Sequence, residues 1–111
     1  MQLTEQDIAA AKSVFHQPPL KANCAQSVAI LAGRDDLVEP FRAFGGGRAP
    51  EGLCGALHAA LALAPESRRE EIIAAFREAA GATTCREIKG VVKTPCEHCV
   101  AIGNKLRAAF A

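Results

Sequence analysis

Residues 84–99 read TCREIKGVVKTPCEHC and carry three of the five cysteines of the chain. Thr84 and Glu87 match a capping box, in which a hydroxyl and a glutamate satisfy free N–H groups in the first turn of a helix. This pattern predicts a short helix over residues 84–89, with Cys85 at its first position.

The same stretch contains a second helix start. Thr94 and the glutamate three positions later repeat the capping pattern, and the proline after Thr94 suits the first helical position, so Cys96 is expected at the second. Further upstream, Asn23 and a glutamine three residues later give a similar signal, and Cys24 lies directly after this cap.

Three cysteines, Cys24, Cys85 and Cys96, are therefore expected at helix N-termini. Such a terminus offers unpaired N–H groups and about half a positive charge, which stabilise a thiolate. The thiolate is the form of cysteine that attacks disulfides and binds metals. These positions therefore favour chemistry at sulfur.

Helical periodicity extends over most of the remaining chain, where apolar residues recur every three or four positions. Capping patterns at Thr4 and Ser67 predict two further helix starts, and prolines and glycines mark the ends. The predicted helices cover residues 4–16, 23–32, 36–44, 50 or 51 to 63, 67–80, 84–89 and 94–109, with residues 90–93 as a loop or a brief extended segment. The sequence thus predicts an all-α fold: one compact bundle of about five to seven helices, with residues 1–111 as a single domain.

The composition excludes several functions. With 13 Lys and Arg against 12 Asp and Glu, no Trp and no Tyr, the chain has neither a basic stripe nor an aromatic platform for nucleic acid. No apolar run approaches the length of a membrane span. The first residues are polar and amphipathic, unlike a signal peptide, so we expect a cytoplasmic protein whose cysteines bind metal, do redox work or stay as buried thiols.

Cys96 and Cys99 form a Cys-x-x-Cys pair, and residues three apart share one face of a helix. The pair fits a redox dithiol, half of a zinc site or half of an iron–sulfur site. It does not fit c-type haem attachment, because Val100 occupies the position that needs histidine.

Cys54 and His58 lie four residues apart on a predicted helix, so His58 is a further candidate ligand or a hydrogen-bond partner of the cysteine. His98 is expected to point away from the face that Cys96 and Cys99 share, and His16 is expected on the surface. The alternative for each cysteine is that it is only a small buried apolar residue.

Five segments, in this order, resemble the C_GCAxxG_C_C family of redox-active proteins. They are Asn23-Cys24-Ala25-Gln26-Ser27-Val28, Phe44-Gly45-Gly46-Gly47, Cys54-Gly55-Ala56-Leu57-His58-Ala59, Thr84-Cys85-Arg86-Glu87 and Pro95-Cys96. One position departs from the pattern: the last glycine of the family motif is Ala59 here.

The resemblance implies that four family cysteines correspond to Cys24, Cys54, Cys85 and Cys96, with Cys99 as an additional one. The family is similar to the cysteine region of split-Soret cytochromes c, which is associated with an iron–sulfur centre, although this chain lacks haem-binding motifs. The resemblance therefore implies redox chemistry.

Three functions follow as hypotheses. In the first, Cys24, Cys54, Cys85 and Cys96 bind an iron–sulfur cluster for electron transfer or redox sensing, with Cys99 and His58 as weaker ligand candidates. In the second, a metal-free thiol–disulfide protein uses Cys96 as the attacking thiol and Cys99 or Cys85 as the resolving one. In the third, four cysteines hold a structural zinc ion.

We also expect an unidentified redox partner protein. The small-residue helix faces of this alanine-rich chain could support a homodimer.

Overall fold

A computed structural model describes residues 2–111, so that Met1 lies outside the described part. The fold is all-α, as predicted, and the described residues contain no strand. Its α-helices are α1 (Glu5–Val14), α2 (Cys24–Leu31), α3 (Gly55–Leu63), α4 (Arg69–Ala80), α5 (Cys85–Glu87) and α6 (Cys96–Ala109). Shorter helical turns are η1 (Asp35–Leu37), η2 (Pro40–Phe44), η3 (Pro50–Gly52), η4 (Glu66–Arg68) and η5 (Ile88–Val92).

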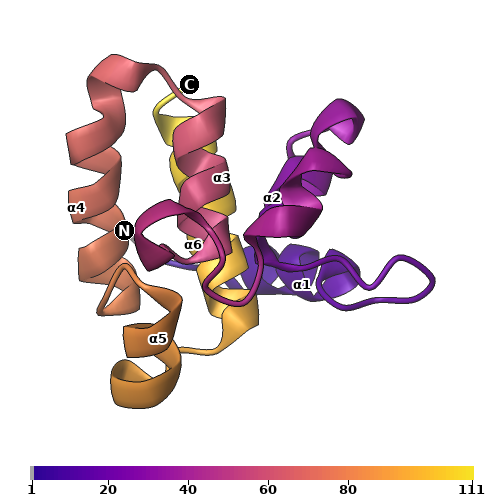
Figure 1. The fold of residues 1–111 in the computed structure, drawn as a ribbon, viewed down its shortest axis with the longest axis horizontal. Helices are drawn as coiled ribbons and strands as arrows, with labels where there is room; N and C mark the ends of the chain where they lie inside the picture. Colours follow the sequence, from indigo (N-terminus) through magenta and orange to yellow (C-terminus); the bar gives the residue numbers. More distant parts are fainter. Residues whose placement is uncertain (1) are drawn as a thin grey trace.

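Helices α3 and α6 form the centre of the bundle (Figure 1). Helix α6 packs against α1, α2, α3 and α4, and α2 also packs on α3. The two central helices approach closely because small residues face each other: a Cβ on Gly103 would lie 2.7 Å from the carbonyl oxygen of Ala56. Across residues 2–111, no helix has both the length and the apolar character needed to cross a bilayer.

Two predicted capping boxes are confirmed. Thr4 caps α1 with Asp7, and Asn23 caps α2 with Gln26, in each case through reciprocal side-chain bonds. Gly81 ends α4 in the left-handed conformation (φ 93°), which glycine adopts without steric cost.

The helix predicted over residues 36–44 is wrong. This segment forms two separate 3-10 turns, η1 and η2, with Pro40 at the start of the second. Proline has no N–H to donate and its ring clashes with the preceding turn, so a continuous α-helix cannot pass through this position.

The helix predicted from Pro50 or Glu51 begins later, at Gly55. Glu51 and Gly52 both have positive φ angles, 62° and 71°, which separate the turn η3 from α3. Cys54 is consequently the N-cap residue of α3 and not a residue of its second turn.

Two other predicted helix starts also differ. Arg68 precedes α4 without a side-chain cap, so the predicted Ser67 cap is wrong. The predicted Thr94 cap is also wrong: Pro95 is the N-cap of α6, Cys96 is its first residue, and the Thr94 hydroxyl instead donates a hydrogen bond of 2.7 Å to the carbonyl oxygen of Ala80. Residues 88–92 form a π-helical turn, where the sequence analysis placed the end of a short helix and a loop.

Candidate functional site

All five cysteines line one cavity of about 60 Å³, here called the thiol cavity. A volume of that size accommodates on the order of four water-sized groups. The lining residues are Phe15, His16, Asn23, Cys24, Gly46, Cys54, Gly55, Cys85, Ile88, Lys89, Cys96 and Cys99. Cysteines separated by up to 75 positions in sequence, Cys24 and Cys99, thus meet at one place, which the sequence alone could not show.

Four of the five thiols lie where a helix begins. Cys24, Cys85 and Cys96 are the first residues of α2, α5 and α6, and Cys54 is the N-cap of α3. Cys99 lies one turn further along α6 and is 1% exposed. Helix N-termini carry unpaired N–H groups and partial positive charge, so four such termini converge on the sulfurs.

A short backbone pairing brings Cys54 next to Cys85. Leu53 and Thr84 form an isolated antiparallel bridge, and the Cys54 N–H donates a 2.8 Å hydrogen bond to the carbonyl oxygen of Thr83. The start of α3 is thereby joined to the start of α5. Thr84 also caps α5, since its hydroxyl oxygen accepts the Glu87 N–H at 3.2 Å.

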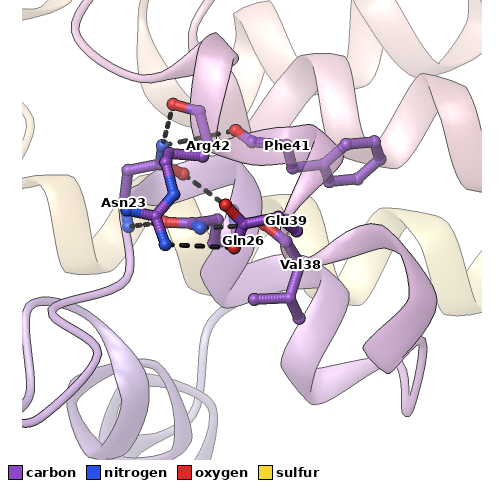
Figure 2. A network of polar contacts seen from close by, with 6 residues as sticks. All are labelled: Asn23, Gln26, Val38, Glu39, Phe41 and Arg42. Carbon is purple, nitrogen blue, oxygen red and sulfur yellow. Dashed lines mark hydrogen bonds and ion pairs between the residues drawn. The ribbon is translucent and has the colours of Figure 1, made fainter.

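Asn23 fixes the position of Cys24 through a network shown in Figure 2. Its side-chain oxygen accepts the Gln26 N–H at 2.8 Å, and its amide donates to the carbonyl oxygens of Phe41 and Arg42 at 3.3 and 3.1 Å. The Gln26 amide donates to the carbonyl oxygen of Val38 at 2.8 Å. The network joins the N-terminus of α2 to η1 and η2.

The glycine that follows η2 is required by this network. A Cβ on Gly45 would lie 2.8 Å from the Asn23 side chain, closer than real Cβ contacts. Gly45 therefore lets the loop of Gly46 and Gly47 pass beside the start of α2 and reach the thiol cavity.

Replacing Asn23 with alanine should lower the free energy of unfolding by about 2 kcal/mol, because a helix cap is lost and two carbonyl groups lose their donor. The matched variant Thr4→Ala removes a capping box whose bonds stay within α1, and should cost only about 1 kcal/mol. Urea denaturation followed by circular dichroism measures both values. Equal losses would contradict the connecting role of Asn23.

The thiols differ in acidity because they interact with one another. Hydrogen bonds from Cys24 and Cys99 lower the pKa of Cys54 well below its usual value, and the N–H groups of Leu57 and Ala56 lower it further. The same interaction with Cys54 raises the pKa values of Cys24 and Cys99, which therefore keep their protons. Among these three thiols, Cys54 is therefore the one whose pKa is shifted toward the thiolate form.

Cys96 is the second acidic thiol. Its pKa falls to about 7, chiefly through a hydrogen bond from Cys24 and also through the positive charge of Lys89. Burial raises the pKa of Cys85, against the opposing effect of Lys89. Cys24 therefore interacts with both of the thiols whose pKa is lowered, Cys54 and Cys96.

Two of the three histidines lie outside the lining of the thiol cavity. His58 is absent from the cavity lining, and its ring lies 4.3 Å from that of Phe44, centroid to centroid. Cys54 is the N-cap of α3 and its carbonyl oxygen accepts the His58 N–H at 2.9 Å, but the His58 side chain does not join Cys54 at the cavity. His98 does not line the cavity either.

Two cavity residues were missed by the sequence analysis. His16 is exposed, as expected, but it also lines the thiol cavity and stacks on Phe15 with the ring centroids 3.8 Å apart. Lys89 lines the cavity from the turn η5. No spacing signal pointed to Lys89, whereas the position of His16 at the end of the first predicted helix, two residues before Pro18, offered a weak one.

The described residues contain no set of side chains arranged around a single metal ion. Within residues 2–111, no group of three or more His, Cys, Asp or Glu side chains is arranged to hold one ion. The five cysteines line one cavity without forming such a group.

No family model matches the chain, and no curated protein or solved structure matches it. The resemblance to the C_GCAxxG_C_C family therefore stays an expectation from the sequence.

Proposed function

We propose that the thiol cavity binds an iron–sulfur cluster and that the protein transfers electrons or senses redox state through it. The observation that carries this proposal is the position of five thiols, four of them at helix starts, around one small cavity. Four cysteine thiolates are the usual ligand set of such clusters.

The ligands proposed from the resemblance are Cys24, Cys54, Cys85 and Cys96, with Cys99 as a fifth thiol at the same cavity. A bound cluster would supply one-electron redox chemistry. Among these residues, Cys54 and Cys96 already favour the thiolate form that ligation requires.

The presence of five thiols at one cavity, with no group among residues 2–111 arranged to hold a single ion, favours a group with several metal ions over one zinc ion. A structural zinc needs four sulfurs at about 2.3 Å from one point. An iron–sulfur cluster instead places separate irons near separate thiolates, so its ligands are distributed around a volume. The zinc hypothesis is retained only as the weaker alternative.

Other lining residues suit the same group. Phe15 and Ile88 supply apolar lining to the cavity. The N–H groups of four helix starts offset the negative charge of several thiolates. Gly46 has no side chain to occupy the cavity, so backbone can come close to whatever binds there.

A second candidate, a metal-free thiol–disulfide protein, is favoured by the position of Cys96 at the start of α6 in the thiol cavity, where its pKa falls to about 7, near the optimum for an attacking thiol. Cys99 and Cys85 line the same cavity, as this hypothesis requires. Cys24 is a further resolving candidate, because it hydrogen-bonds to Cys96.

Anaerobic purification and reconstitution with iron and sulfide distinguish the two candidates. The proposal expects a coloured protein with stoichiometric iron and acid-labile sulfide. A colourless product without iron would refute it. Thiol titration and mass mapping of the same sample then test the second candidate, which requires a disulfide at Cys96 that forms and is reduced reversibly.

A further inference from the structure

A second cavity adjoins the thiol cavity. This outer groove has a volume of about 500 Å³ and is lined by Gly46, Gly47, Glu51, Gly52, Thr84, Cys85, Arg86 and Lys89. Its volume falls within the range of about 300–1,000 Å³ that is usual for small-molecule sites. Added Cβ atoms at Gly46 and Gly52 would meet no atom within 4 Å, so the glycines leave the groove open.

The outer groove has a positive charge excess. Arg86 and Lys89 line it, and neither takes part in an ion pair within the part of the chain that the structure describes. The one carboxylate in the lining, Glu51, lies 3.4 Å from Arg69 and is partly neutralised by it. An anion entering the groove therefore meets two free cations.

The two cavities share three residues, Gly46, Cys85 and Lys89. Cys85 is the only one of the five thiols that lines both cavities. A molecule in the outer groove would therefore contact a sulfur that faces the thiol cavity on its other side. Gly47 lies beside the Cys85 side chain, since a Cβ on Gly47 would be 3.5 Å from the Cβ of Cys85.

We infer that the outer groove is a docking site for a small anionic electron carrier, bound by Arg86 and Lys89 and positioned against Cys85. The inference rests on the proposed redox function of the thiol cavity. In the exchange, the reduced site loses one electron and the carrier gains it, while no bond forms or breaks and no proton has to move. The two cations bind the carrier and are positioning residues.

Binding can be tested without metal or turnover. Hexacyanocobaltate(III), a redox-inert trivalent anion, is titrated at low salt into the reduced, metal-free full chain while backbone amide NMR signals are followed. The shifts should concentrate at residues 46–52 and 84–89. The variant Arg86→Glu/Lys89→Glu should weaken binding by about tenfold or more, because both attractive charges are reversed.

The matched control is Lys12→Glu/Arg77→Glu, which makes the same change in net charge at exposed residues that line neither cavity. It should change the affinity less than about twofold, since distant charges are screened. Shifts scattered over the surface, or an equal loss in the control, would overturn the inference.

The electron step is tested on reconstituted protein with two oxidants of opposite charge. At low salt, Arg86→Glu/Lys89→Glu should slow oxidation by ferricyanide about tenfold and accelerate oxidation by hexaammineruthenium(III), with both effects reduced at high salt. Equal rates with the wild type for both oxidants would overturn the inference. If the anion binds at the groove but the reconstituted wild-type protein reacts with neither oxidant, the proposed redox function is refuted. Only the anion binding at the groove would then remain.

Discussion

Cys54→Ala should abolish iron binding by the reconstituted protein, reducing the bound iron at least about tenfold. Cys54 interacts with two other thiols, those of Cys24 and Cys99, and it is 4% exposed. Its pKa is also lowered at the start of α3, which favours the thiolate, the form that binds metal. Iron and sulfide analysis after anaerobic reconstitution measures the effect.

The substitution should leave the fold in place. The Cys54 sulfur interacts with the N–H groups of Ala56 and Leu57, which alanine would leave without this partner at the start of α3. The backbone bond from the Cys54 N–H to Thr83 does not depend on the side chain and keeps the start of α3 in position. Circular dichroism and a urea transition check this directly, so a loss of iron can be separated from unfolding.

Cys99→Ala is the matched control, because it removes a buried thiol from the same cavity while the four cysteines implied by the resemblance remain. It should retain most of the iron. Full iron content in Cys54→Ala would contradict the assignment of Cys54 as a ligand, and loss of iron in Cys99→Ala alone would assign Cys99 to the ligand set.

The second large effect is expected on stability. Gly103→Ala should lower the free energy of unfolding by about 2–3 kcal/mol, because the added methyl group would lie 2.7 Å from the Ala56 carbonyl oxygen and 3.1 Å from the Ala56 Cβ. The backbone of α3 cannot move aside like a flexible side chain, so α3 and α6 must separate. This cost outweighs the gain of about 1 kcal/mol that alanine brings to a helix.

Gly90→Ala is the control for this prediction. Gly90 lies in the exposed turn η5, and an added Cβ would meet no atom within 4 Å. Its stability should change by less than about 1 kcal/mol. Urea denaturation of the two variants gives the comparison, and similar values would show that the contact between α3 and α6 can relax.

Local chemistry made much of the helical architecture predictable. The signals at Thr4 and Asn23 act within four residues of chain, so the starts of α1 and α2 followed from neighbouring side chains alone. Thr84 likewise caps α5, which places Cys85 at its first position. The same local reasoning failed at Thr94, whose hydroxyl bonds to Ala80 at the end of a different helix.

The start of α3 shows why boundaries were less predictable than helices. Apolar periodicity continues through residues 50–63, but Glu51 adopts a left-handed conformation and Leu53 pairs with Thr84. That pairing joins residues 31 positions apart, so no window of sequence contains its cause. Cys54 is therefore the N-cap of α3, whereas the sequence pattern had placed it inside the helix.

Residue types and short-range hydrogen bonds were enough to specify an all-helical chain with Cys24, Cys85 and Cys96 in first turns or at first positions of helices. Only the packing of α2, α3, α5 and α6 decided that these sulfurs meet Cys54 and Cys99 at one cavity, and that Lys89 and His16 join them while His58 does not. The reason is physical: a cap is a contact within one turn, whereas a shared cavity depends on contacts between segments far apart along the chain.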